Sequence, residues 1–281
     1  MVVYLDDITI FSKKRGEHTF HLKQIFERCR KYGISLNPKK CVFAVTEGKL
    51  LGHIVSKRGI SIDPERIKAI EQIPMPHNRK GMQSFMGTIN FVRRFVPDFA
   101  QTVKPLQQMV KQNAQFKWTE TKKNAFSKIK TVVAHAPSLK IPDFDKDFIM
   151  YTFASDDSLA AVLMQKEEGG EEFPISFMST RLQGAELNYP AIDKQAYAVF
   201  KAVKLFRPYI LKNRTKVIVP YPAVRSLLIQ KELGERRGNW VIALQEYDLE
   251  FKPATIVKGQ GLCKLMTESG NNEESLRPNY I

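Results

Sequence analysis

Two short apolar runs open the chain, and two carboxylates separate them. Residues 2–5 and 8–11 are rich in residues that favour β-strands, whereas Asp6 and Asp7 stand where the chain must turn. This pattern predicts a β-hairpin that holds both carboxylates at its tip. Adjacent carboxylates repel each other unless a cation lies between them, and Mg²⁺ is a hard cation that prefers oxygen ligands. An ordinary solvated turn is the alternative interpretation of the same pair.

The next residues show helical and strand patterns in turn. Apolar side chains recur at helical spacing from Glu17 to Tyr32, and Gly33 is suited to end that helix. Asp63 and Pro64 are typical of a helix start, as N-cap and first helical residue. Between these two helices the pattern predicts short strands over residues 34–36, 41–45, 49–56 and 60–62.

Two apolar helical faces follow a Pro-rich break at residues 74–76. The first face predicts a helix within residues 82–99 and consists of Phe85, Met86, Ile89, Val92 and Phe95. Thr119 is a suitable N-cap for the second helix, whose inward positions are Ala125, Phe126, Ile129, Val132 and Val133. Both faces are interpreted as core packing.

The second half of the chain follows the order strand, strand, strand, helix, strand, helix, strand. Strands are predicted over residues 147–152, 160–165, 173–179, 215–219 and 249–253, and helices over residues 189–206 and 240–247. Asp156 and Asp157 lie in a turn-prone stretch between two strands and are interpreted as solvated. This order predicts a domain that contains both strands and helices.

The two halves of the chain differ in net charge. The 281 residues carry a formal net charge of +15, and residues 1–136 hold 25 Lys and Arg against 10 Asp and Glu. The remaining residues hold 19 of each, so the whole basic excess lies in the first half. Such an excess is an electrostatic footprint for a polyanion, most simply nucleic acid, although a basic solvated surface has the same composition.

Composition also excludes several classes of protein. No long uncharged apolar run is present, the first five residues lack the basic start and cleavage site expected of a signal peptide, and the three cysteines are widely spaced. We therefore expect an intracellular protein, in a cytoplasmic particle or the nucleus, with free thiols.

Several motifs occur in the order that gypsy-type (Ty3-like) LTR-retrotransposon reverse transcriptases have them. Tyr4-Leu5-Asp6-Asp7 resembles the Tyr-x-Asp-Asp hairpin of that family. Further similar segments are residues 33–43 and 51–56 in the palm, and residues 82–99, 104–106 and 116–119 in the thumb. The resemblance implies an α+β fold: a partial reverse-transcriptase palm and thumb, followed by an RNase H-like α/β domain with a mixed sheet. It implies a palm remnant over residues 1–75, thumb helices over 76–136, an RNase H-like domain over 137–268 and a disordered tail over 269–281.

The RNase H-like part departs from its family at the catalytic positions. Residues 173–177, 186–189, 244–248 and 258–260 carry the similarity. Active members hold two metal ions with four acidic residues. The resemblance places Phe153, Gln195, Pro220 and Lys264 at those four positions. None can replace a carboxylate ligand, and Lys264 would repel a metal. The expectation is a decayed domain kept as a connection, as some plant gypsy-type elements have.

The family's polymerase sites are carried over residue by residue. The resemblance implies that Asp6 and Asp7 are catalytic and bind Mg²⁺, and that Tyr4 packs near the primer. Lys39 or Lys40 is a candidate to protonate pyrophosphate. Clustered cations near the ends of a thumb helix can follow phosphates, although each is as well explained by a solvated face; these cations are Arg79, Lys80, Arg93 and Arg94.

Three interpretations of the whole chain stay open at this point. The chain begins at the hairpin, so the fingers and the upstream metal-binding Asp are expected to be missing. In the first interpretation, the chain is a fragment of a retrotransposon polyprotein and is inactive alone. Its partners are the upstream polymerase region or other polyprotein parts and an RNA template with its DNA primer, or their hybrid. The alternatives are a non-catalytic nucleic-acid-binding or scaffold protein domesticated from a retroelement, and a decayed gene product. An in-frame fingers region in the upstream DNA would favour the first.

Overall fold

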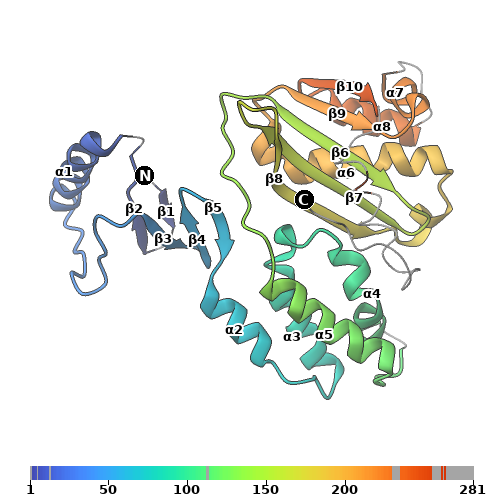
Figure 1. Cartoon of the computed structure of the whole chain (residues 1–281), viewed down its shortest axis with the longest axis horizontal. Coiled ribbons are helices and arrows are strands. Elements are labelled where there is room, and N and C mark those ends of the chain that lie inside the picture. Colours follow the sequence, from blue (N-terminus) through green and yellow to red (C-terminus); the bar gives the residue numbers. More distant parts are fainter. Residues whose placement is uncertain are drawn as a thin grey trace. The chain divides into compact units, whose positions relative to one another are not determined.

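The computed structural model describes residues 2–4, 6–12, 14–111, 114–229 and 235–254, together with residues 261 and 263. It divides into two compact units, residues 1–57 and residues 58–281, and each is described by itself (Figure 1). The predicted mixed α+β fold is confirmed.

The first unit consists of two hairpins and a helix. Its elements are β1 (Val2–Tyr4), β2 (Asp7–Thr9), α1 (Arg15–Lys31), β3 (Glu47–Leu50) and β4 (His53–Ser56). The hairpin predicted at the start of the chain is present, because β1 and β2 pair antiparallel with Tyr4 opposite Asp7. Helix α1 ends beside Gly33, whose φ of 66° is the left-handed conformation that a glycine accepts at a helix end.

Three strand predictions in this unit are wrong. Residues 34–36 and 41–45 form no strand, and the run over residues 49–56 is a hairpin. Strands β3 and β4 pair antiparallel with Leu50 opposite His53, so only Leu51 and Gly52 turn the chain. Both residues have positive φ, 51° and 75°, as a tight type I′ hairpin turn requires. Such a turn is difficult to predict within an apolar run when the first turn residue is apolar and only the second is a glycine.

The second unit begins with a helical bundle, which we define as helices α2 to α5. Its elements are β5 (Gly59–Ile62), α2 (Pro64–Gln72), α3 (Arg79–Asn90), a 3₁₀ turn η1 (Arg93–Phe95), α4 (Phe99–Met109) and α5 (Glu120–Ala134). Asp63 caps α2 as predicted, because its side chain accepts a hydrogen bond from the Glu65 amide. Thr119 stands at the N-cap of α5, but its side chain makes no capping hydrogen bond.

The helix predicted within residues 82–99 is interrupted. Helix α3 ends at Asn90, the chain forms η1, and α4 starts only at Phe99. Pro97 disfavours helical geometry at Val96, which is extended and separates η1 from α4. Val92 and Phe95 are nevertheless fully buried. The apolar pattern therefore predicted the burial of these side chains correctly, but it was wrong to predict one continuous helix.

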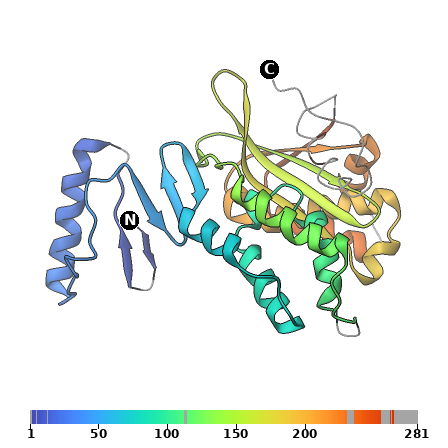
Figure 2. The same ribbon diagram turned by 60° about the horizontal axis from the view of Figure 1, so that its bottom comes forward.

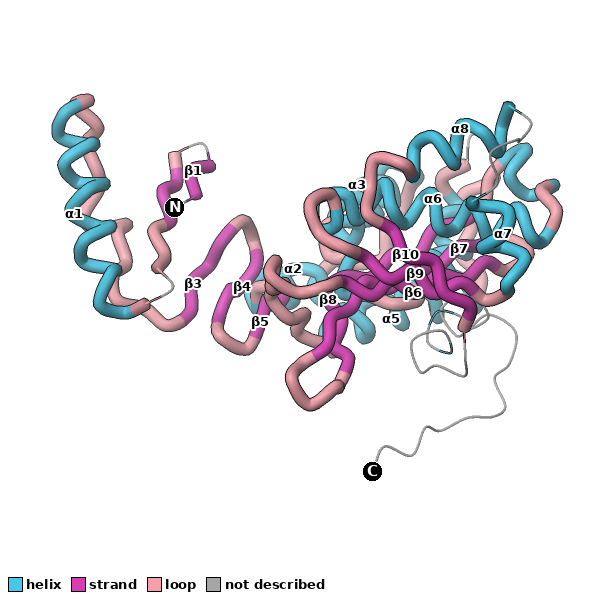
Figure 3. The backbone as a smooth tube through the Cα atoms, turned by 90° about the horizontal axis from the view of Figure 1, so that it is seen from above, coloured by secondary structure: helices cyan, strands magenta, loops and turns pink. Residues whose placement is uncertain are grey.

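The rest of the second unit consists of a five-stranded mixed sheet and its helices (Figure 3). We call this part the sheet domain. Its elements are β6 (Phe148–Ala154), β7 (Ser158–Lys166), β8 (Glu172–Arg181), a 3₁₀ turn η2 (Gly184–Asn188), α6 (Ala191–Ile210), β9 (Thr215–Val219), α7 (Pro222–Ile229), α8 (Glu235–Leu244) and β10 (Leu249–Pro253). The strand order is β10-β9-β6-β7-β8, with β6, β9 and β10 parallel and the other pairs antiparallel. The predicted elements occur in the predicted order, and the mixed sheet is the one that the resemblance implies, but helix α7 between β9 and α8 was not predicted.

Both faces of this sheet are buried. Phe148 and Met150 of β6 belong to one apolar cluster with helices α6, α7 and α8. Ile149 and Tyr151 of the same strand belong to a second cluster, which includes the buried side chains of the helical bundle. The green bundle helices accordingly lie against the yellow-green strands in Figure 2. The second cluster therefore joins the helical bundle to the sheet domain in one shared hydrophobic core. Within the described residues, no helix has the length and apolar character needed to cross a membrane.

Candidate functional site

The Asp-Asp hairpin presents its carboxylates to solvent. Asp6 lies in the turn and Asp7 begins β2, and both residues are exposed. Among the residues that the structure describes, no group of three or more His, Cys, Asp or Glu side chains is placed to hold a metal. The hairpin thus offers oxygen ligands of the kind Mg²⁺ prefers, but only a pair of carboxylates. The side chain of Tyr4 lies outside the described part of the chain.

The two lysines carried over from the polymerase family are also exposed. Lys39 and Lys40 lie in a turn, and the Lys39 amide donates to the side-chain oxygen of Asn37 at 3.0 Å. Their ammonium groups are therefore available to solvent and to an anionic ligand.

The positions implied for RNase H acids hold groups that serve the fold. Phe153 on β6 is half-buried and packs against the apolar cluster that the sheet shares with the helical bundle. Pro220 directly follows β9 and is half-buried. Lys264 lies outside the described residues. No carboxylate can be assigned to the two positions on β6 and β9, because their side chains are a phenyl ring and a pyrrolidine ring.

Gln195 makes the most specific contact of this group. Its side chain, 5% exposed on α6, lies against the backbone of Ala154 at the end of β6. The Gln195 Oε1 accepts from the Ala154 amide at 2.9 Å, and its Nε2 donates to the Ala154 carbonyl at 2.7 Å. Both ends of the amide are therefore used, and they join helix to strand. A carboxylate could accept the first bond but not donate the second.

The predicted phosphate-binding cations differ in how many contacts they make with other residues of the chain. Arg79 donates to the Ala114 carbonyl at 3.0 Å, and Arg94 is half-buried with its guanidinium 5.0 Å from the Phe95 ring. Arg93 donates to the Ser179 carbonyl of β8 at 2.9 Å, and burial lowers the pKa of its guanidinium.

Lys80 is the exposed member of the same group. The structure therefore gives the three arginines packing contacts, whereas Lys80 extends from the surface of α3.

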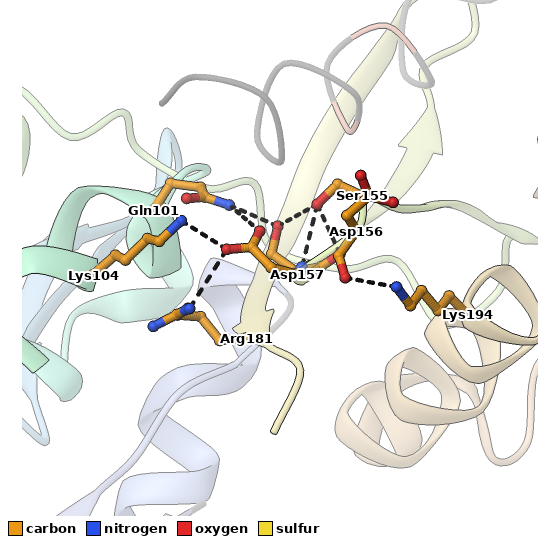
Figure 4. A network of polar contacts seen from close by, with 8 residues as sticks. Gln101, Lys104, Ser155, Asp156, Asp157, Arg181 and Lys194 are labelled. Carbon is orange, nitrogen blue, oxygen red and sulfur yellow. Dashed lines mark hydrogen bonds and ion pairs between the residues drawn. The ribbon is translucent and has the colours of Figure 1, made fainter. Parts of the chain in front are cut away.

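Asp157 is not simply solvated, which corrects the sequence interpretation (Figure 4). It lies at the β6–β7 turn and receives a hydrogen bond and ion pair from Lys104 of α4, with Nζ 2.7 Å from Oδ2. Gln101 of the same helix donates to Asp157 at 3.3 Å and to Ser158 at 2.8 Å. Arg181 of β8 lies 3.5 Å from the same carboxylate. One carboxylate thus links the helical bundle to two strands.

Asp156, its neighbour, has an exposed side chain. Only its backbone takes part in the network, because its carbonyl accepts a hydrogen bond from Lys194 of α6 at 2.7 Å (Figure 4). The prediction of a solvated carboxylate is therefore right for Asp156 and wrong for Asp157.

We expect Asp157→Asn to lower the free energy of unfolding by about 1 kcal/mol, because the pair with Lys104 is partly exposed. Burial alone would raise the pKa of Asp157, but the hydrogen bond and charge of Lys104, with Gln101 and Arg181, outweigh it and hold that pKa below its usual value. The contribution is therefore present above the ordinary Asp pKa of about 3.9 and is lost as pH falls through the lowered value.

Urea unfolding of wild type and variant at neutral and acidic pH measures this effect. The difference between the two proteins should shrink as the pH falls. Asp156→Asn is the matched control and should leave stability unchanged. A wild type and Asp157→Asn variant of equal stability at neutral pH would show that the network contributes nothing.

Comparison with known proteins gives the family. A sequence model described as "Reverse transcriptase (RNA-dependent DNA polymerase)" matches residues 1–55, and one described as "RNase H-like domain found in reverse transcriptase" matches residues 118–217. The chain is 36% identical over 284 residues to the "Retrovirus-related Pol polyprotein from transposon 297" of Drosophila melanogaster. The chain belongs to the reverse transcriptases of gypsy-type LTR retrotransposons.

The gypsy-type relatives are much longer than this chain. The match covers 98% of this chain but 26% of the Drosophila polyprotein. The "Transposon Tf2-3 polyprotein" of Schizosaccharomyces pombe is 32% identical over 255 residues, which are 89% of this chain and 19% of that polyprotein. The chain is thus a retrotransposon polyprotein segment that carries reverse transcriptase and RNase H-like sequence.

Solved structures share the fold of this gypsy-type chain. The foamy viral protease-reverse transcriptase in complex with RNA/DNA hybrid has a TM-score of 0.78 at 22% identity, over 96% of this chain and 37% of that one. The same viral protein in complex with dsDNA has a TM-score of 0.75 at 24% identity, over 88% of this chain and 53% of that one.

Proposed function

We propose that this chain supplies the Asp-Asp hairpin, the thumb and a non-cleaving connection to a retrotransposon reverse transcriptase. In this proposal residues 1–75 belong to the palm, 76–136 to the thumb and 137–268 to the RNase H-like domain. The partner is an RNA template with its DNA primer, or their hybrid. Support comes from the basic first half and from the similar fold of the foamy viral protease-reverse transcriptase, which was solved in complex with dsDNA and with RNA/DNA hybrid.

The contact between Gln195 and Ala154 is the observation that carries the proposal of a non-cleaving domain. A residue whose two amide ends both bond to the backbone is committed to the fold. Together with Phe153 in the shared core, it supports a domain selected for its shape rather than for cutting RNA.

The polymerase role rests on the exposed pair Asp6 and Asp7, whose carboxylates fit the oxygen preference of Mg²⁺. Bound Mg²⁺ would stabilise phosphate charge during nucleotidyl transfer. Two carboxylates alone leave most positions around such an ion to water, substrate and other protein groups. Further ligands are therefore assigned to the rest of the polymerase. Lys39 or Lys40 is proposed to donate a proton to the leaving pyrophosphate.

We expect the 281-residue chain not to extend a DNA primer on an RNA template with either Mg²⁺ or Mn²⁺. A site with only Asp6 and Asp7 cannot hold two metal ions in place for an in-line displacement. Incorporation of labelled nucleotide measures the activity, with Asp6→Asn as the comparison. Extension by the wild type that Asp6→Asn abolishes would show that this hairpin suffices.

Hybrid binding is expected to be weak, independent of sequence and steeply weakened by salt. Lys80→Gln should weaken binding and reduce the slope of log affinity against log salt by about 1, because one phosphate contact releases about one counterion. Fluorescence anisotropy with a labelled RNA–DNA hybrid measures both quantities. Lys204→Gln is the matched control, since Lys204 is exposed in the half of the chain that has no net charge. An equal loss in the two variants would contradict a footprint confined to the first half.

A further inference from the structure

An open pocket of about 320 Å³ lies where the helical bundle meets β8. We call it the junction pocket. Its walls come from α3, from η1 and α4, and from the end of β8 with the residues after it; they include Asn90, Arg93, Gln107, Thr180, Arg181 and Gln183. Among the residues that the structure describes, no Asp or Glu lines the pocket, and Arg93 and Arg181 are the charged side chains in its walls.

The two arginines retain unused hydrogen-bonding capacity. A guanidinium carries five N–H donors. Arg181 reaches Asp157 at 3.5 Å, which is long for a hydrogen bond, and that carboxylate is already held by Lys104 at 2.7 Å. The Nε of Arg181 is buried without a partner in the described part of the chain. Arg181 is therefore poorly satisfied by its own protein.

Arg93 adds a second guanidinium to the pocket. It is fixed by its bond to the Ser179 carbonyl and by a longer one, 3.4 Å, to Asn90. Burial disfavours its charge, and an anion beside it would offset that cost. Guanidinium groups bind phosphate with pairs of parallel hydrogen bonds.

The remaining walls suit an organic group next to a phosphate. Met86, Phe99 and Ala100 provide apolar surface, and amide and hydroxyl groups stand around them. The volume is at the small end of the usual range for ligand pockets, about 300–1,000 Å³. Its size and mixed lining match a nucleotide unit better than a bare inorganic ion.

We propose that the junction pocket binds a nucleotide phosphate, held by Arg93 and Arg181, with its sugar or base against Met86 and Phe99. The phosphate can come from a free nucleotide or from a nucleic-acid strand. A ligand there would touch the bundle and β8 at once, so binding stabilises their junction. This site is distinct from the Asp6 and Asp7 hairpin and does not depend on the proposed polymerase role.

Gly87 allows the pocket to be closed without removing either arginine. It lies on α3, lines the pocket, and a Cβ built on it meets no atom within 4 Å. Gly87→Leu therefore places an apolar side chain at the pocket, while Gly87→Ala adds only a methyl group. Both changes favour the helix relative to glycine, so loss of folding is not expected.

The test is calorimetric titration of the whole chain with AMP, inorganic phosphate and adenosine. AMP should bind, inorganic phosphate more weakly and adenosine least, and AMP should raise the melting temperature. Gly87→Leu should weaken AMP binding at least about tenfold, and Arg181→Gln similarly, whereas Gly87→Ala should bind nearly as wild type does. Undetectable AMP binding at millimolar concentration, or unchanged binding in Gly87→Leu, would overturn the proposal.

An RNA–DNA hybrid added as competitor distinguishes the two sources of phosphate. Displacement of AMP by the hybrid from the wild type, together with weaker hybrid binding by Gly87→Leu, assigns the site to a strand phosphate. Simultaneous binding of AMP and hybrid assigns it to a free nucleotide. Either result supports a phosphate site at the junction.

Discussion

The RNA strand of an RNA–DNA hybrid is expected to remain intact with this chain at any concentration of Mg²⁺ or Mn²⁺. The position implied for the first catalytic acid holds Phe153, whose ring packs in the core shared with the helical bundle. The second holds Gln195, whose amide is bonded to the backbone of Ala154. Two-metal hydrolysis needs several carboxylates that converge on the ions.

Phe153→Asp alone should not restore cleavage, because Gln195 and Pro220 still supply no carboxylate. Cleavage of a labelled hybrid by the whole chain, wild type beside Phe153→Asp, measures this, with circular dichroism as the control for folding. The proteins should come from a host that lacks its own RNase H. Cleavage by the wild type would mean that the catalytic positions are assigned to the wrong residues.

Gln195→Glu, the change to the acid that the resemblance implies at this position, is expected to destabilise the chain by about 3 kcal/mol at neutral pH. The amide donates to the Ala154 carbonyl at 2.7 Å, and a carboxylate would place a negative oxygen against that carbonyl instead. The site is buried, so neither water nor solvent screening reduces the repulsion.

The same variant should depend on pH in a defined direction. Burial and the facing carbonyl would raise the pKa of the new carboxyl group in the folded state. The folded protein then binds more protons than the unfolded one, so its stability falls as pH rises above the ordinary Glu pKa of about 4.3. At low pH the protonated carboxyl group can donate to Ala154, and most of the loss should disappear.

Urea unfolding across this pH range measures both effects of Gln195→Glu. Gln183→Glu is the matched control: Gln183 is exposed and its side chain accepts a backbone hydrogen bond, which a carboxylate also accepts. It should change stability by less than about 0.5 kcal/mol. If Gln195→Glu is as stable as the control at neutral pH, the amide is not the link that we infer.

Features set by neighbouring residues could be predicted from the sequence. The turn at Asp6, the cap at Asp63 and the helix end at Gly33 each depend on residues within one turn. The strands of the sheet domain could be predicted from their apolar runs, because strands buried on both faces are apolar almost throughout, whereas their arrangement in a mixed sheet was implied by the family resemblance.

Features set by distant residues could not be predicted. Asp157 looks like a solvated turn residue until Lys104, 53 positions earlier, is brought beside it. Gln195 was identified by resemblance as a lost acid, but its partner Ala154 is 41 positions away. The short Leu51–Gly52 turn was missed because apolar residues flank it on both sides.

The burial of both sheet faces limits where a protease can cut the retrotransposon polyprotein. Cleavage by a protease near residue 136, followed by separation of the products, would uncover Ile149, Tyr151, Val162 and Phe177 on one side of the sheet. A sheet with such a face exposed is prone to self-association. The helical bundle and the RNase H-like domain are therefore expected to unfold in one calorimetric transition and to stay on one mature polypeptide.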